Sequence, residues 1–244
     1  MRPGHLGSHV ALVTGSGGGI GRATVMAFAG EGATVVGVSR RDDDGSLRAE
    51  AEALGGAYLH CTGDVREAAT AKAAVELAIA NFGRVDTLIN NVGIGLYGDF
   101  VDATEQTYDD IMDTNMKSTF LFTKEVVPHM IECGGGLLVQ IASQAGIQGF
   151  AREAIYCASK HAQVGFTKAL RRELQPHGIK VGVICPAAVR TNFAVGHGRD
   201  EASLANESLF LRAEDIAAAV LFMAMQDSGS RVIDIGMVSL GESL

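Results

Sequence analysis

Two side chains with complementary acid–base chemistry lie four residues apart in the second half of the chain. Tyr156 and Lys160 occur in the segment IYCASK, residues 155–160, and Ser143 precedes the tyrosine by thirteen positions. If this segment is helical, the phenol and the ammonium share one face, and the positive charge favours the phenolate. The pair is then a proton donor tuned towards neutral pH. Taken alone, the same spacing also fits a solvated lysine beside a half-buried tyrosine.

A glycine-rich turn near the start of the chain predicts a binding site for a dinucleotide. The apolar residues 10–13 run into TGSGGGIG, residues 14–21, and a helix-favouring segment follows at 22–29. Backbone N–H groups at the start of such a helix bind a pyrophosphate, and residues without a Cβ let it approach closely. The spacing is Gly-x3-Gly-x-Gly, unlike the commoner Gly-x-Gly-x-x-Gly. Taken alone, the loop also fits a flexible turn.

Alternating strand and helix patterns predict the elements that must position these residues. Helical periodicity is readable at 68–82 and 154–175, and short β-branched runs occur at 10–13, 34–38, 57–60, 87–89, 137–141, 180–184 and 232–238. This alternation is typical of an α/β fold: a Rossmann-like, doubly wound, seven-stranded and mostly parallel sheet flanked by helices on both faces.

The chain length of 244 residues suits a single domain. We expect residues 1–9 to form a flexible N-terminal extension. Residues 190–211 lack a clear period and contain two glycines, so they are predicted to form a lid over the substrate.

Composition and charge exclude several classes of function. The net charge is −8, with 20 basic and 28 acidic residues and no basic block, so nucleic acid is not an expected partner. The longest apolar run, 216–225, is too short to span a membrane, and residues 1–9 do not resemble a signal peptide, which predicts a soluble, cytoplasmic protein. The four cysteines and seven histidines show no metal-ligand spacing, so no metal site is expected.

Taken together, the motifs resemble the classical short-chain dehydrogenase/reductase family. The resemblance runs from about Val10 to Thr191, and its elements follow the family's order: the turn at 14–21, Asp64, NNVG at 90–93, Asn115, Ser143, and Tyr156-x3-Lys160. It implies an NAD(P)-dependent oxidoreductase that interconverts a carbonyl, of ketone or 3-oxoacyl type, and a secondary alcohol. It also implies a homo-oligomer, either a dimer or a tetramer. The C-terminus departs from the family's usual Asp-Gly-Gly ending, which leaves the tetramer open.

The resemblance also assigns roles to individual residues. Tyr156 would be the general acid and base, Lys160 would support it and hold the nicotinamide ribose, Ser143 would bind the carbonyl oxygen, and Asn115 would hold a water in a proton relay. Asp64 would contact the adenine amino group. The full set of predicted coenzyme contacts is Gly15, Ser16, Gly19, Ile20, Gly21, Ser39, Arg40, Arg41, Asp64, Val65, Asn91, Val92, Gly93, Tyr156, Lys160, Pro186, Val189 and Thr191.

The end of the second strand indicates which coenzyme binds. A carboxylate at this position would bind the ribose hydroxyls of NAD, but here Ser39 is followed by Arg40 and Arg41. A guanidinium pairs well with a 2′-phosphate, so NADP(H) is favoured and NAD(H) is the alternative. The aspartates at 42–44 weaken this argument if they neutralise the arginines.

Three functional hypotheses fit the sequence. The first is an NADP(H)-dependent oxidoreductase, with an NAD-dependent alcohol dehydrogenase as its variant. An epimerase or dehydratase of the extended branch is less favoured, because a larger C-terminal domain is absent. The third, a non-catalytic dinucleotide sensor, leaves the four candidate catalytic residues unexplained.

The predicted apolar wall of the substrate pocket consists of Ile94, Leu96, Ala145, Ile147, Phe150 and Phe193.

Overall fold

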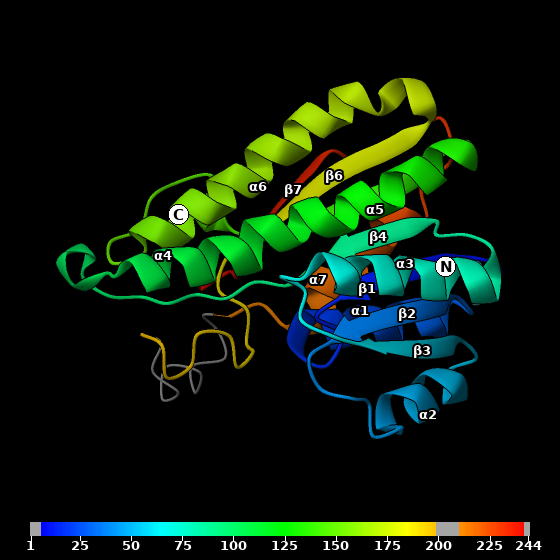
Figure 1. Cartoon of the computed structure of the whole chain (residues 1–244), viewed down its shortest axis with the longest axis horizontal. Coiled ribbons are helices and arrows are strands. Elements are labelled where there is room, and N and C mark those ends of the chain that lie inside the picture. Colours follow the sequence, from blue (N-terminus) through cyan, green and yellow to red (C-terminus); the bar gives the residue numbers. More distant parts are fainter. Residues whose placement is uncertain (1–5, 199–209, 242–244) are drawn as a thin grey trace.

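Seven parallel strands form one sheet, and helices cover both of its faces (Figure 1). The computed structural model describes residues 6–198 and 210–241. The strands are β1 (Val10–Thr14), β2 (Thr34–Ser39), β3 (Ala57–Thr62), β4 (Thr87–Asn90), β5 (Gly136–Ile141), β6 (Ile179–Pro186) and β7 (Asp234–Met237). Their order across the sheet is β3-β2-β1-β4-β5-β6-β7, and every neighbouring pair is parallel. The predicted Rossmann-like fold is confirmed.

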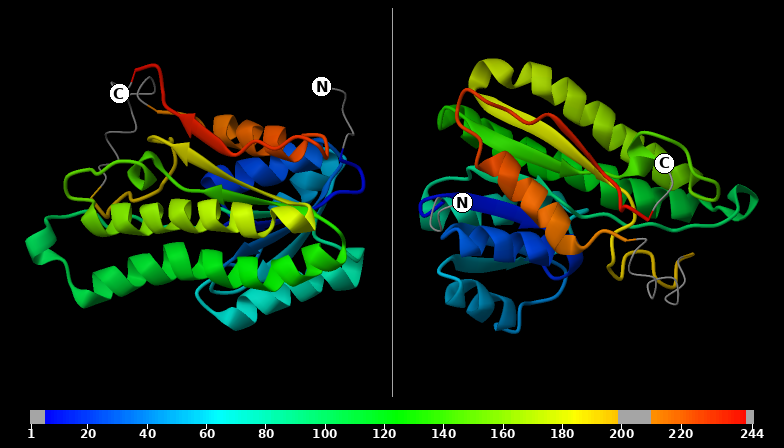
Figure 2. Two further views of the ribbon diagram at one scale, coloured as in Figure 1. Left: turned by 90° about the horizontal axis from the view of Figure 1, so that it is seen from above. Right: turned by 180° about the vertical axis from the view of Figure 1, so that it is seen from behind.

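Helices alternate with the strands along the chain. They are α1 (Gly19–Gly30), α2 (Ser46–Ala53), α3 (Ala68–Phe82), α4 (Glu105–Met112), α5 (Ser118–Glu132), α6 (Ala154–Glu173) and α7 (Ala213–Ala224). A single π-helical turn, Asp113–Lys117, joins α4 to α5. The two helices therefore run on as one long rod beside α6, and its α4 end projects beyond the sheet (Figures 1 and 2).

Alternating side chains of the central strand divide the core into two layers. In β1, Ala11 and Val13 pack with Phe28 of α1 and Val220 of α7, whereas the neighbouring positions Val10 and Leu12 pack with residues of α3 and α5. Both sets are buried, because helices cover each face. Figure 2 shows α1 and α7 together on the face opposite α5 and α6.

The strand order creates a place for ligands at one edge of the sheet. The chain leaves β1 towards β2 on one side, but β4 pairs with β1 on its other side. In open parallel sheets, ligands bind beyond the carboxyl ends of the strands at such a reversal. This edge carries the glycine turn after β1, Ser39 at the end of β2, Asn91 after β4, Ser143 after β5 and the loop after Pro186 of β6.

Some boundaries differ from those predicted. Leu6 is buried and its N–H bonds the Glu31 carbonyl, and the His9 carbonyl accepts from Thr34 N. Leu6 and His9 are thus held against the domain, unlike a flexible extension, while Gly7 and Ser8 between them are exposed. Residues 1–5 lie outside the described part. The long helix ends at Glu173, before a 3₁₀ turn at Gln175–His177. In the described ranges, no helix combines the length and apolar character that crossing a membrane requires.

Candidate active site

Glycines shape the turn between β1 and α1. α1 begins at Gly19, and Gly18 before it has no side chain to cap the first N–H groups. A Cβ on Gly21 would lie 2.0 Å from the carbonyl oxygen of Gly15, so only glycine fits there. A Cβ on Gly18, by contrast, would meet nothing within 4 Å. The positive end of the helix dipole is therefore open to an anionic group such as a diphosphate.

Segments that follow β4 and β6 close on this turn. A Cβ on Gly15 would lie 2.9 Å from Asn91 Nδ2, and that amide donates to the carbonyl of Thr14 at 2.9 Å. A Cβ on Gly19 would lie 3.1 Å from Thr191 Cγ2. The structure thus brings together predicted coenzyme residues from three separate loops.

Lys160 carries a charge into the protein interior. Lys160 is 3% exposed, and among described residues its Nζ donates only to the Ile141 carbonyl, at 3.3 Å. Burial lowers the pKa of Lys160 to about 8. Nζ also lies 5.7 Å from the ring centroid of Tyr156, one helical turn earlier on α6. A Cβ on Gly93 would be 3.2 Å from the same Nζ, which places the lysine beside the loop after β4.

Asn115 lies in the π-helical turn and holds two segments in place. Its Oδ1 accepts from Ile94 N at 2.7 Å, while Nδ2 donates to the Ile94 carbonyl at 3.0 Å and to Ser159 Oγ at 2.9 Å. The loop after β4 is thereby tied to α6. The Asn115 carbonyl accepts from Thr119 Oγ1 and Gln163 Nε2, at 2.9 and 2.8 Å. The predicted relay water would have to share this oxygen with two donors.

Ser143 follows the carboxyl end of β5 and caps a short 3₁₀ turn. Its Oγ accepts from Ala145 N at 3.1 Å. Because the oxygen is engaged as an acceptor, the hydroxyl hydrogen is the part of this group that can bond a carbonyl oxygen. The sequence permits both interpretations of Ser143, as a turn cap and as a substrate contact, and the two are compatible.

Aromatic rings cover the candidate proton donor. Tyr97 meets Tyr156 edge to face, with centroids 5.5 Å apart, and Phe193 lies at 5.8 Å on a tilted plane. Tyr156 is consequently only 6% exposed. The Tyr97 N–H bonds the His197 carbonyl at 3.0 Å, which joins the loop after β4 to the one after β6. Of the other predicted wall residues, Ala145 packs against Tyr156, while Ile147 is exposed.

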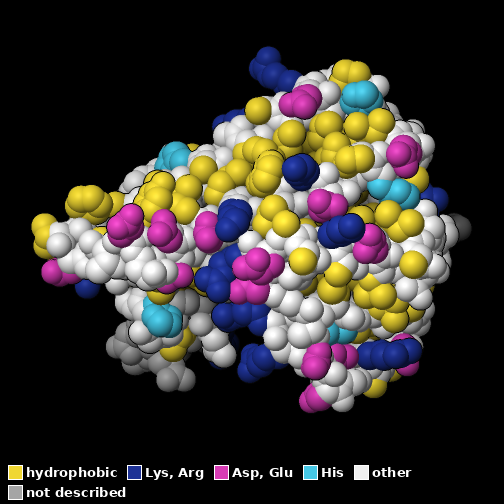
Figure 3. All heavy atoms as spheres, in the orientation of Figure 1, with side chains coloured by type: hydrophobic (Ala, Val, Ile, Leu, Met, Phe, Trp, Pro, Cys, Tyr) yellow, Lys and Arg dark blue, Asp and Glu magenta, His cyan; other side chains and the backbone are white. Residues whose placement is uncertain are grey.

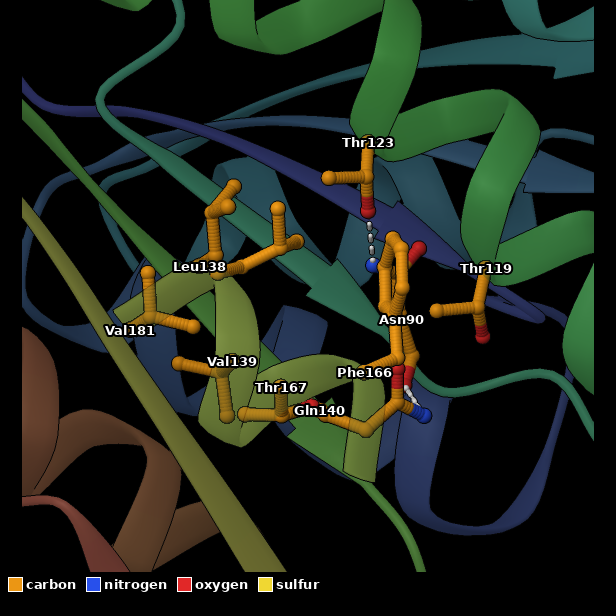
Figure 4. Close-up of a pocket in the computed structure, with 10 residues that line it drawn as sticks. Asn90, Thr119, Thr123, Leu138, Val139, Gln140, Phe166, Thr167 and Val181 are labelled. Atoms are coloured by element: carbon orange, nitrogen blue, oxygen red, sulfur yellow. Dashed lines mark hydrogen bonds between the residues drawn. The ribbon is translucent and has the colours of Figure 1, made fainter. Parts of the chain in front are cut away.

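A small pocket lies between α5, α6 and the sheet (Figure 4). Its volume is about 10 Å³, which is room for one water at most and not for a substrate. Figure 4 shows Asn90 pointing at Thr123, to which it donates at 3.1 Å, and Gln140 Nε2 donates to the Asn90 carbonyl at 3.2 Å. These contacts favour a structural role for Asn90.

The aspartates near the end of β2 are bonded to groups other than the neighbouring arginines. Asp42 accepts a hydrogen bond from Thr62, and the carboxylates of Asp43 and Asp44 accept from backbone N–H groups at the start of α2. Arg40 and Arg41 are exposed, and neither guanidinium forms an ion pair within the described residues. The negative charges therefore do not tie up the predicted phosphate-binding side chains.

Asp64 is held by a residue that the sequence analysis does not anticipate. Arg66 donates to both of its oxygens, with Nη2 at 2.7 Å from Oδ2. This hydrogen bonding holds the pKa of Asp64 below its ordinary value. An adenine amino group would have to share the carboxylate with Arg66.

The remaining predicted coenzyme residues lie at the same edge of the sheet. Ile20 packs against the core below the turn, Val65 and Val189 are buried, and Pro186 ends β6. Of the predicted lid, residues 190–198 and 210–211 are described, and Arg190 N bonds the Leu211 carbonyl; residues 199–209 lie outside the described part. No group of three or more His, Cys, Asp or Glu in residues 6–198 and 210–241 could hold a metal ion.

Sequence reasoning misses three residues that shape the site: Tyr97, Arg66 and Gln163. Gln163 carries the one readable signal, because it lies three positions after Lys160 and so shares its helix face. Tyr97 and Arg66 lie in loops, whose conformation cannot be read from a repeating sequence pattern as a helix face can. The structure places Lys160 beside Tyr156, ties Asn115 to Ser159, and sets Ser143 next to Ala145, which packs against Tyr156. The roles of the four predicted catalytic residues stay predictions.

Comparisons with known proteins agree with this geometry. The chain matches the family model described as short chain dehydrogenase over residues 9–202. It is 41% identical over 196 residues, covering 77% of this chain and 73% of the relative, to a Streptomyces virginiae protein named as a ketoacyl reductase of the monensin polyketide synthase. It is 35% identical to a 3-oxoacyl-[acyl-carrier-protein] reductase of Thermotoga maritima, covering 90% of this chain and 91% of the relative.

A solved structure has the same architecture throughout. The crystal structure of levodione reductase superimposes with a TM-score of 0.86 and 28% identity, covering 96% of this chain and 97% of the other.

The buried charge of Lys160 generates a prediction about stability. The native pKa of about 8 lies below the unfolded value of 10.5, so below pH 8 burial of the ammonium opposes folding by roughly 3 kcal/mol. This penalty declines as pH rises from 8 to 10.5, because the native lysine then loses its proton first. The Lys160→Met variant of the ligand-free protein should therefore be more stable at pH 7, by an amount that shrinks towards pH 10.5.

Urea unfolding of both proteins at several pH values measures this difference. Lys168→Met, on the exposed side of the same helix, is the matched control and should show no such trend. A Lys160→Met advantage that is absent at pH 7, or that is constant with pH, would contradict the assigned cost of burial.

Proposed function

The chain belongs to the short-chain dehydrogenase family, and from that premise we propose that it is an NADP(H)-dependent reductase of a ketone or 3-oxoacyl carbonyl, with Tyr156 as general acid. Enzymes of this family act on CH–OH and C=O groups with a nicotinamide coenzyme, and the chain is such an oxidoreductase. The proposal rests chiefly on one observation: the loop after β4 contacts the glycine turn through Asn91 and lies beside Lys160 Nζ at Gly93, so it joins the turn to the Tyr156–Lys160 pair.

The residues of the chain have separable tasks in the proposed reaction. A bound nicotinamide supplies the hydride for the carbonyl carbon. Tyr156 gives its phenolic proton to the carbonyl oxygen, and in the oxidative direction it takes that proton back. The Ser143 hydroxyl donates to the same oxygen and orients it. Lys160 stabilises the phenolate that remains after proton transfer, because its charge is buried nearby and weakly screened.

Asn115 acts mainly by positioning in this proposal. Its side chain fixes Ile94 on one side and Ser159 on the other, next to the catalytic lysine. The carbonyl that would hold a relay water already accepts from Thr119 and Gln163. A water there would need to displace or share one of these bonds.

Two features support NADP(H) over NAD(H). Arg40 and Arg41 follow β2 without ion pairs in the described structure, and the three nearby aspartates are engaged by Thr62 and by the start of α2. A 2′-phosphate at this place would meet two available guanidinium groups. An NAD-dependent alcohol dehydrogenase stays the alternative.

Homo-oligomer formation is part of the proposal. Exposed apolar side chains occur before and along the α4–α5 rod, among them Phe100, Val101 and Phe120. Figure 3 shows hydrophobic side chains gathered over α5 and α6 on one face of the molecule. Contact with a second subunit would remove such surface from water.

The role of Tyr156 is tested by Tyr156→Phe, which removes only the hydroxyl. We expect kcat to fall by about a hundredfold or more, because the transferable proton is lost, while the Kd for NADPH changes little. Tyr108→Phe is the control, since that ring is half exposed on α4, away from the glycine turn. Near wild-type turnover of Tyr156→Phe would exclude it as the proton donor.

Coenzyme choice is tested by Arg40→Ala. The wild-type enzyme should have the higher kcat/KM with NADPH, and the variant should lose about one to two powers of ten with NADPH and little with NADH. Arg48→Ala, which removes an exposed guanidinium paired with Glu52 on α2, is the matched control. A wild-type preference for NADH would overturn the assignment.

The aromatic rings over Tyr156 predict an effect on substrate size. Tyr97→Ala and Phe193→Ala should each raise kcat/KM for a bulky aryl ketone relative to a short aliphatic ketone, by about tenfold, because a ring beside the phenol is removed. Initial rates with a matched ketone series measure the ratio. An unchanged ratio in both variants would mean that neither ring limits access to the phenol.

A further inference from the structure

A chain of hydrogen bonds connects the glycine turn to the segment that follows β2. Ser16 Oγ lies 3.1 Å from Tyr58 Oη, Tyr58 Oη lies 2.9 Å from His60 Nδ1, and His60 Nε2 lies 3.0 Å from the Arg41 carbonyl oxygen. Ser16 belongs to the turn, while Tyr58 and His60 belong to β3. The outermost strand on this side thus reaches across β2 to the turn beside β1.

The inner part of this chain is buried and closely fitted. Ser16 is fully buried and Tyr58 is 2% exposed. Gly37 of β2 makes the space, because a Cβ there would lie 2.3 Å from Tyr58 Oη and 2.5 Å from Ser16 Oγ. Burial also raises the pKa of Tyr58 to about 12, so the phenol keeps its proton and can donate at neutral pH.

With a neutral His60 ring, the acceptor at the far end sets the direction of these bonds. A carbonyl oxygen only accepts, so His60 Nε2 must carry a hydrogen, and in the neutral ring Nδ1 then accepts from the Tyr58 hydroxyl. The phenol oxygen in turn accepts from Ser16. Ser39 Oγ donates to the same Arg41 carbonyl at 2.8 Å, so two donors hold that peptide group.

This network supports the backbone from which Arg40 and Arg41 project. Both side chains are exposed, and their guanidinium groups have no ion pair in the described structure that would orient them. The position of residues 39–41 is instead set through the backbone, from the Arg41 carbonyl back to the glycine turn. A coenzyme bound at the turn would therefore meet the backbone of residues 39–41, from which the arginines project, in a fixed position.

We propose that Tyr58 and His60 are positioning residues for coenzyme discrimination, which fix residues 39–41 relative to the glycine turn without touching the coenzyme. The inference rests on the proposed function, because it assumes that residues 39–41 face the adenosine ribose. It adds to the glycine turn and the arginine pair two residues of β3 that influence which coenzyme is preferred. A purely structural role for the network would instead affect both coenzymes alike.

Tyr58→Phe and His60→Leu test the proposal, with kcat/KM measured for NADPH and NADH in each variant. Each substitution should shift the ratio of the two values by about three- to tenfold, as expected for one lost hydrogen bond that positions a charge, while kcat with the better coenzyme stays within twofold. His60→Gln can still donate to the Arg41 carbonyl and should restore most of the ratio. Tyr108→Phe is the matched control.

Hydrogen exchange gives a second measurement that does not depend on activity. Amides of residues 39–45 should exchange faster in His60→Leu than in the wild type, and His60→Gln should reverse the change. An equal loss with both coenzymes and unchanged exchange at 39–45 would overturn the proposal.

Failure of the proposed function is distinguishable from failure of this inference. If the wild-type enzyme prefers NADH, the arginine assignment is wrong, yet the ratio must still shift in Tyr58→Phe and His60→Leu if the network positions residues 39–41. If Arg40→Ala abolishes an NADPH preference that the two β3 variants leave unchanged, the arginines are confirmed and the positioning role is rejected.

Discussion

The site depends on one buried charge. Lys160 lies on α6 with only the Ile141 carbonyl as its partner among described residues, and burial lowers its pKa to about 8. Such an ammonium opposes folding, so the surrounding elements must be held by other contacts. Asn115 supplies several of them by tying Ser159, next to the lysine, to the loop after β4. The same low polarity that makes the charge unfavourable in the empty protein increases its effect on a neighbouring phenolate.

The parts of the site that sequence predicts are those with local causes. The turn at 14–21 follows from glycines whose Cβ atoms would collide, and Tyr156 and Lys160 share a face because α6 covers both. The parallel sheet follows from β-branched runs between helical periods. These patterns lie within single elements or adjacent ones, so they can be read without knowledge of tertiary packing.

The parts that sequence does not predict arise from contacts between distant segments. The bond from Ser16 to Tyr58 joins residues 42 positions apart, and it exists because the register of β2 and β3 places Gly37 between them. Tyr97 meets Tyr156 from a loop whose backbone is bonded to the loop after β6. Arg66 is near Asp64 in sequence, but the loop conformation decides whether it pairs with that carboxylate. No period or spacing in the sequence predicts these contacts.

Gln163 lies on the same helix as Tyr156 and Lys160 and supports the interior of the site through its side-chain amide. Its amide nitrogen bonds the Asn115 carbonyl and Thr119 Oγ1, while its own Oε1 is buried and has no partner in the described structure. An unsatisfied buried acceptor is unfavourable, so the two donated bonds must compensate for it. Both of these bonds lie at the π-helical turn that contains Asn115 and leads into α5. The polar interior between α5 and α6 thus stabilises the same turn that brings Asn115 to the lysine.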